Sequence, residues 1–275
     1  MPCTKELFLK LSGKHIAILV ADGVEGLDSF VLMTRFVVRS VFFLCVPALA
    51  QTQSDTAGAI WSIDNVTTIG SYPANVFGNP IVKELSYGNV VEFDGIDDGI
   101  LVQGFPLNKE LSFTAEVIFN PYDAFPDNSE QRFMHVQSPK HNNRRFLIEL
   151  RLNDKKEWFI DTHIQADSAF LTCLAKEFPH PVDQWYHVVF TYADGVAKHY
   201  VNGVEEMRGN VQYIPVDSAS VSLGMRMNTV SFFRGAIHSV AFSKRGLKPG
   251  GFLLSSQFAK IQKEREVDSV FQQTR

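Results

Sequence analysis

Short runs of β-branched, aromatic and alternating apolar residues recur roughly every ten residues after Gln51, separated by Gly, Pro, Asn and Asp. No segment before Gly250 has a helical period. Regular short strands without helices predict an all-β fold, an antiparallel sandwich or jelly roll. The predicted strands are Val90–Phe93, Ile100–Val102, Ser112–Phe119, Arg132–Gln137, Arg145–Leu152, Trp158–Gln165, Tyr186–Tyr192, Ala197–Val201, Ser220–Gly224, Val230–Phe233 and Ala236–Phe242.

The composition is ordinary for a globular protein and narrows the choice of partner. Hydrophobic residues make up 45% of the 275 residues and charged residues 20%. The 23 Phe against three Trp suit strands packed between two sheets. The formal net charge is −4 and no basic stripe is present, so we expect no nucleic-acid partner.

Residues 33–50 have the three parts of a secretory signal peptide. Arg35 and Arg39 supply the positive region, Val41–Ala50 is an apolar run, and Ala48-Leu49-Ala50 forms the cleavage site before Gln51. The apolar run is about half the roughly twenty residues that a membrane span needs. We therefore predict a secreted or periplasmic protein without a membrane span. The expected organisation is an extension (1–32), a signal peptide (33–50), one domain (51–252) and a polar tail (253–275).

The extension carries a resemblance of its own. The stretch "LSGKHIAILVADGVEGLDSF", residues 11–30, resembles the opening strand and turn of the DJ-1/PfpI superfamily, including Glu25. Nothing after it continues the α/β domain of that family, so no catalytic residue is carried over. Two other origins for residues 1–32 stay open, namely a start codon assigned too early, with Met33 the true start, and a fusion.

Four segments in order and spacing resemble the laminin-G-like jelly roll of the concanavalin A-like lectin/glucanase superfamily. They are "VVEFDGIDDGILV" (90–102), "LSFTAEVIFNP" (111–121), "WYHVVFTYADGVAKHYVNG" (185–203) and "FFRGAIHSVAFSKRGL" (232–247). The resemblance covers about residues 58–252 and implies an antiparallel two-sheet jelly-roll sandwich with curved sheets, of which the concave one often presents the ligand face. That superfamily includes sugar-binding modules, glycoside hydrolases and polysaccharide lyases, so the fold alone does not decide activity.

Alternation along the strands predicts a polar face on one sheet. In "RFLIELRL" and "WFIDTHIQ", every second residue is apolar and predicted to be in the core, while the others point outward. "QRFMHVQ" and "LGMRMN" divide in the same way. The predicted ligand-binding residues are His135, Gln137, Arg145, Glu149, Arg151, Asp161, His163, Gln165, Arg226 and Asn228. The arginines would hold anionic or hydroxyl groups, and the alternative is a solvated face with cross-strand ion pairs.

Asp94, Asp97 and Asp98 form an acidic turn that is the sequence's one candidate metal site. Ca²⁺ is the ion that such oxygen ligands would hold, but it takes six to eight oxygens. Three carboxylates on one turn are too few alone, and the alternative is a turn that caps a strand.

These residues favour a secreted carbohydrate-binding module whose partner is a glycan or polysaccharide, with an anionic one as a possibility. No complete catalytic constellation is present: no Glu-x-Asp-x-Glu run, nucleophile elbow, zinc-protease helix or phosphate loop occurs. A polysaccharide lyase or a glycoside hydrolase on the same fold is the alternative. A cell-surface adhesion module with a protein partner is the third interpretation, and an exposed apolar patch would favour it.

Overall fold

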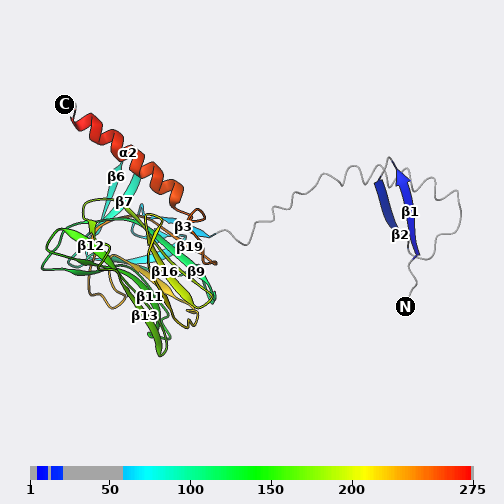
Figure 1. Cartoon of the computed structure of the whole chain (residues 1–275), viewed down its shortest axis with the longest axis horizontal. Coiled ribbons are helices and arrows are strands. Elements are labelled where there is room, and N and C mark those ends of the chain that lie inside the picture. Colours follow the sequence, from blue (N-terminus) through cyan, green and yellow to red (C-terminus); the bar gives the residue numbers. More distant parts are fainter. Residues whose placement is uncertain (1–4, 12–13, 21–57, 274–275) are drawn as a thin grey trace. The chain divides into compact units, whose positions relative to one another are not determined.

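The computed structural model describes residues 5–11, 14–20 and 58–273. The chain divides into two units, residues 1–55 and residues 56–275. In the first unit, β1 (Lys5–Leu11) and β2 (Lys14–Val20) form an antiparallel hairpin. The predicted signal peptide lies outside the described residues. The second unit contains two antiparallel sheets and one helix (Figure 1). The predicted all-β jelly-roll sandwich is confirmed.

The first sheet has nine strands in the order β13-β12-β11-β10-β18-β8-β5-β4, and β14 also pairs with β12. Their bounds are β4 (Thr68–Ile69), β5 (Tyr72–Phe77), β8 (Gly99–Val102), β10 (Glu130–Gln137), β11 (Arg144–Leu152), β12 (Glu157–Ala166), β13 (Ala169–Leu174), β14 (His180–Pro181) and β18 (Ser220–Leu223).

The second sheet has eight strands in the order β17-β16-β15-β9-β19-β7-β6, and β3 pairs with β19. Their bounds are β3 (Ala59–Ser62), β6 (Ile81–Leu85), β7 (Gly88–Asp94), β9 (Phe113–Pro121), β15 (Tyr186–Ala193), β16 (Val196–Val201), β17 (Val204–Asn210) and β19 (Arg234–Ser243). The predicted strand Val230–Phe233 is wrong, because those residues lie in the loop that precedes β19.

Phenylalanine rings join the two sheets across the core. Phe119 on β9 stacks on Phe133 of β10 with ring centroids 4.2 Å apart, and Phe113 on β9 stacks on Phe146 of β11 at 4.6 Å. All four rings are buried. Stacked aromatic pairs contribute about 0.5–1.5 kcal/mol each beyond their buried area, so these contacts align the sheets as well as filling the space between them.

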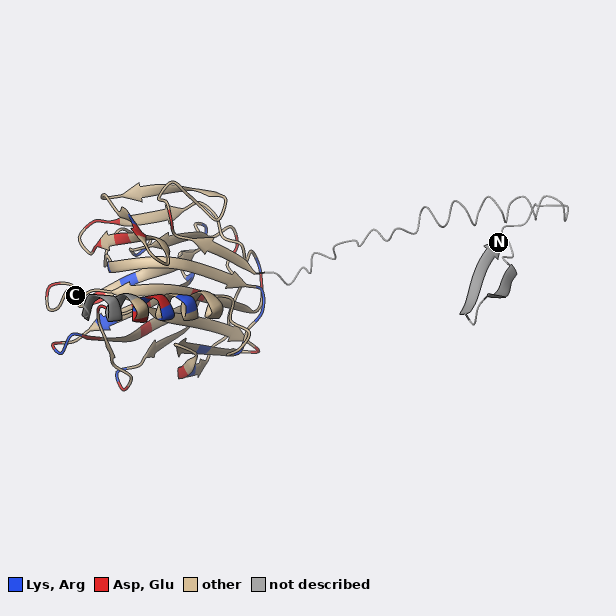
Figure 2. Ribbon diagram, turned by 90° about the horizontal axis from the view of Figure 1, so that it is seen from above, with Lys and Arg blue, Asp and Glu red and all other residues tan. Residues whose placement is uncertain are grey.

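The predicted polar tail contains a helix, α2 (Ser255–Gln273), on the outer side of the eight-stranded sheet (Figure 1). Leu254 and Ile261 are buried against Trp185 and Ile118 of this sheet. Acidic and basic residues follow one another along the exposed part of α2, without a stripe of one sign (Figure 2). Among the described residues, no helix combines the length and apolar character that a membrane crossing requires.

Glu116, a fully buried carboxylate on β9, attaches the start of this C-terminal segment to the sheet. Its oxygens accept hydrogen bonds from the backbone N–H groups of Leu253 (2.7 Å) and Leu254 (3.0 Å), and its Oε2 lies 2.9 Å from Nε2 of His187. One side chain thus satisfies three polar groups that would otherwise be buried without a partner.

We expect Glu116→Ala to lower the free energy of unfolding by about 3–5 kcal/mol, because it leaves a buried histidine and two buried N–H groups unpaired. Urea unfolding checks this. The matched control is Glu110→Ala, which removes a surface ion pair with Lys244 and should cost less than about 1 kcal/mol. Equal losses in the two variants would contradict the role assigned to Glu116.

Candidate functional site

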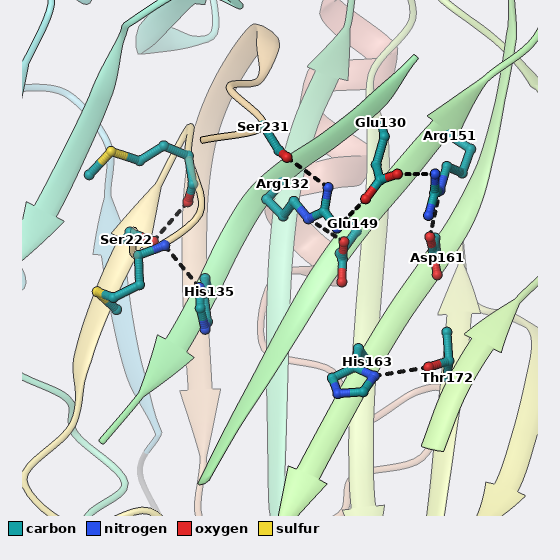
Figure 3. A network of polar contacts seen from close by, with 12 residues as sticks. Glu130, Arg132, His135, Glu149, Arg151, Asp161, His163, Thr172, Ser222 and Ser231 are labelled. Atoms are coloured by element: carbon teal, nitrogen blue, oxygen red, sulfur yellow. Dashed lines mark hydrogen bonds and ion pairs between the residues drawn. The ribbon is translucent and has the colours of Figure 1, made fainter. Parts of the chain in front are cut away.

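A network of arginines and carboxylates covers the outer face of β10, β11 and β12 (Figure 3). Arg132 pairs with Glu130 and Glu149. Arg151 pairs with Glu130 and, through its Nε, with Oδ2 of Asp161 at 2.6 Å. Three carboxylates therefore hold two guanidinium groups, and three of the four ion pairs join neighbouring strands, as the alternative interpretation of cross-strand ion pairs also predicts.

A β-bulge at Phe133 decides which residues join this network. The pairing of β10 with β11 shifts between Arg132 and Met134, so that Arg132 lies opposite Glu149 while Met134 lies opposite Ile148. Strict alternation from His135 would send Arg132 inward and Phe133 outward. The bulge reverses this, because the extra residue lets Phe133 enter the core and returns Arg132 to the polar face. The sequence pattern therefore missed Arg132 and Glu130.

A hollow of about 210 Å³ lies on this face. Six of the ten predicted ligand-binding residues line it, namely Arg145, Glu149, Arg151, Asp161, His163 and Arg226. Arg132, Leu147 and Thr172 complete its lining. Side chains from β10, β11, β12, β13 and the loop after β18 thus meet at one place, as the predicted common face requires.

Arg226 reaches the hollow from a loop and not from a strand. β18 ends at Leu223, and Gly224 turns the chain with a φ of +75°, where a Cβ would lie 2.3 Å from the ring of Phe93. The predicted alternation through "LGMRMN" is therefore wrong beyond Leu223. The backbone N–H of Met227 donates to Nδ1 of His135 at 3.0 Å, so this buried histidine holds the loop that presents Arg226.

The remaining predicted residues lie outside the lining of the hollow. Gln137 and Gln165 flank Arg145 on the neighbouring strands, in one row across the sheet. Nε2 of Gln165 donates to the backbone oxygen of Asp167. Asn228 lies in the turn after Arg226. His135 acts on the site through the loop that it holds, because it is not part of the lining.

Burial shifts the titration of the ionisable groups here. Burial raises the pKa of Glu149 to about 7, although nearby Arg132 works against the shift. Burial, with Arg145 and Arg226 as further causes, lowers the pKa of His135 to about 3. The same causes lower the pKa of His163. Both histidines are therefore neutral at pH 7, and the charge of the hollow depends on its arginines and carboxylates.

Phe170 adds an exposed aromatic surface that sequence analysis missed. It lies on β13 opposite Gln165, so it shares a face with Thr172 and His163. Its ring is stacked against His163, with centroids 6.1 Å apart, and the residue is 65% exposed. Nδ1 of His163 lies 2.9 Å from Oγ1 of Thr172, which fixes the imidazole beside the hollow. The alternation of "AFLTCL" was the signal that could have revealed this edge strand.

The acidic turn brings Asp94, Asp97 and Asp98 together, with one oxygen of each within 4.8 Å of the others. Much of their oxygen capacity is used by the backbone. Oδ1 of Asp94 accepts from the N–H groups of Ile96, Asp97 and Asp98, and Asp98 accepts from the N–H groups of Asn79 and Asp94. These bonds fit a turn that ends β7, and calcium binding stays a prediction.

A larger hollow of about 1270 Å³ lies beside this turn, along β6, β7 and residues 122–128. Its lining includes Tyr122, Phe125 and several aspartates. Phe125, in the turn between β9 and β10, is 42% exposed, so this hollow also has an exposed aromatic ring beside it. The smaller hollow is the better candidate because buried charged groups are fixed around it, whereas most of the aspartates near the larger one are wholly or partly exposed.

A family model described as the concanavalin A-like lectin/glucanases superfamily (Laminin_G_3) matches residues 94–250. The chain belongs to this superfamily. The resemblance of residues 11–30 to the DJ-1/PfpI superfamily is not supported. No curated protein matches the sequence.

Solved structures of similar fold agree with this assignment. Domain 4 of AbnA, an extracellular arabinanase from Geobacillus stearothermophilus, solved in complex with arabinotriose, is 18% identical with a TM-score of 0.53, and the match covers 72% of this chain and 96% of that domain. The binding domain of botulinum neurotoxin DC, in complex with SialylT, is 11% identical with a TM-score of 0.54, over 74% and 51% of the two chains. At such identities the likeness establishes the fold.

The buried carboxyl of Glu149 should make stability fall as pH rises. Because its folded pKa of about 7 exceeds the ordinary value of 4.5, the folded protein binds a proton between these values that the unfolded chain releases. Relative to Glu149→Gln, wild-type protein should lose roughly 3 kcal/mol of unfolding free energy between pH 4.5 and 7.5. Denaturation across this range checks it, and a pH-independent difference would contradict the shift. Glu110→Gln, at the surface, serves as the control.

The calcium prediction is tested on the same domain by thermal unfolding. If the acidic turn holds the ion, millimolar CaCl₂ raises the melting temperature of the wild type, because a ligand that binds only the folded state stabilises it. Asp97→Asn should abolish the rise, since Asp97 supplies an exposed carboxylate. If calcium does not change the melting temperature, the three aspartates serve only to accept hydrogen bonds from the backbone of the turn.

Proposed function

We propose that this protein binds a glycan on the outer face of the nine-stranded sheet, over the hollow lined by Arg145, His163 and Arg226. The observation that carries the proposal is the exposed ring of Phe170 beside a hollow of fixed, planar hydrogen-bonding groups. Sugars present apolar C–H faces and hydroxyl edges, so an aromatic surface next to arginines and carboxylates matches both. The arabinotriose complex of domain 4 of AbnA supports the proposal, since its fold is similar.

A glycan-array screen with purified domain, followed by titration of the best ligand, tests this function. We expect Phe170→Ala combined with His163→Ala to weaken binding about tenfold or more, because an aromatic contact contributes about 0.5–1.5 kcal/mol beyond its area and the histidine contact is lost as well. The matched control is Phe125→Ala, which removes the exposed ring beside the larger hollow. Loss of binding in the control alone would move the site to that hollow.

Catalysis on the bound glycan is a second candidate, favoured by one observation. A carboxyl with a pKa near 7 suits a general acid or base, and Glu149 has this property within the hollow. Glu149→Gln should then abolish release of shortened products while the glycan still binds. Failure of the wild-type protein to shorten any glycan that it binds would leave the binding function alone.

We also propose that the protein is exported, with Gln51 as the first residue of the mature chain. The signal-peptide pattern of residues 33–50 supports this. Amino-terminal sequencing of the protein recovered outside the cytoplasm would read from Gln51. A chain that stays inside the cell with residues 33–50 intact would refute it.

A further inference from the structure

The four arginines that line the hollow fall into two classes. Arg132 and Arg151 are held by Glu130, Glu149 and Asp161. Among the residues that the structure describes, Arg145 and Arg226 form no ion pair with a carboxylate. The first two guanidinium groups are neutralised parts of the scaffold, whereas the other two keep an unmatched positive charge at the hollow.

Arg145 in particular is left with an unused donor. Its Nη1 donates to the backbone oxygen of Asn142, but its Nε is buried and has no hydrogen-bond partner. Burial and the nearby charge of Arg226 lower the pKa of Arg145. A desolvated donor beside a like charge is unfavourable in the free protein, and an anion between the two guanidinium groups would relieve both costs.

His163 supplies a further unmatched atom on the same wall. Its Nδ1 is fixed by Thr172, and its Nε2 is buried without a hydrogen-bond partner. Glu149 favours the charged form of Arg145, and Asp161 favours the charged form of His163. Both carboxylates already form ion pairs, Glu149 with Arg132 and Asp161 with Arg151, and neither forms one with Arg145 or Arg226.

The size of the hollow limits what can enter. Sites for drug-sized ligands measure about 300–1,000 Å³, so about 210 Å³ suits a single sugar unit or its charged substituent. Arginine presents planar, paired donors that match a carboxylate or another oxyanion in a bidentate way. The exposed ring of Phe170 lies beside the hollow and offers a surface for the next unit of a chain.

We propose that Arg145 and Arg226 clamp the oxyanion of an acidic glycan, such as the carboxylate of a uronate, while Phe170 packs against the adjoining sugar. This inference rests on the proposed glycan-binding function and narrows its ligand class from glycans in general to anionic ones. Arg132 and Arg151 position the hollow and do not take the anion.

The test compares matched ligands by calorimetry: oligogalacturonate, its methyl ester, sulfated dextran and unmodified dextran. Wild-type protein should bind oligogalacturonate at least about tenfold more tightly than the ester, and Arg145→Gln and Arg226→Gln should each lose about tenfold or more of that affinity. Preference for sulfated dextran over oligogalacturonate would assign the clamp to sulfate. Arg208→Gln, an exposed arginine on β17, controls for general charge and should bind as wild type does.

Equal affinity for acid and ester, or unchanged acid affinity in Arg145→Gln and Arg226→Gln, would overturn the clamp. Glycan binding itself survives that result if neutral dextran or the ester binds and Phe170→Ala weakens it. Binding to none of these ligands and to nothing on a glycan array would remove both proposals.

Thermal unfolding without ligand provides an independent measurement. Arg132→Gln should lower the melting temperature, because it leaves the buried carboxylate of Glu149 without its ion-pair partner and removes one of the two arginines that pair with Glu130. Arg145→Gln should leave the melting temperature unchanged or raise it, because the charge that it removes is unmatched in the free protein. A fall in Arg145→Gln equal to that in Arg132→Gln would show that Arg145 is also structural and would overturn the division of the arginines.

Discussion

The β-bulge at Phe133 is the constraint on which the rest of the structure depends, because it links the core to the polar face. On one side, it lets Phe133 stack on Phe119 and so joins β10 to the opposite sheet. On the other side, it places Arg132 opposite Glu149, where the guanidinium group can pair with this carboxylate. A strand of strict alternation could not do both, since successive side chains point to opposite faces.

The arginine–carboxylate network shapes the site more than it stabilises the protein. Charges that leave water lose solvation, and their mutual attraction in the protein often only offsets that loss. Glu149 illustrates the balance, because burial raises its pKa to about 7 despite the neighbouring Arg132. The ion pairs of the network hold the side chains of Arg132 and Arg151 in place, and this determines the shape of the hollow that they line. Arg145 and Arg226 then stand out by having no carboxylate partner among the described residues.

The two sheets of the domain differ in how their outer faces are used. The segment that begins at Phe252, together with α2, covers part of the eight-stranded sheet, where Glu116, Leu254 and Ile261 are buried. The outer face of β10, β11 and β12 instead carries the charged hollow, with Phe170 exposed beside it. This asymmetry explains why the nine-stranded sheet is the better place to look for a ligand, although the fold alone is compatible with several functions.

The sequence by itself determined the class of fold and the kind of side chain on each face. Ten of the eleven predicted strands correspond to strands of the structure, because alternation and turn residues are local signals. The same alternation placed Arg145, Glu149, Arg151, Asp161 and His163 on one face, and these residues line the hollow.

Only the tertiary structure decided the register and the loops. The bulge that brings in Arg132 arises from the pairing of β10 with β11, and the position of Arg226 depends on a glycine turn and on the contact with His135. Phe170 lies on the edge strand β13. The alternation of this short strand does not show which of its faces is the outer one, and the pairing with β12 decides it. Strand pairing and a loop contact set these features, so alternation along a single segment does not by itself fix them.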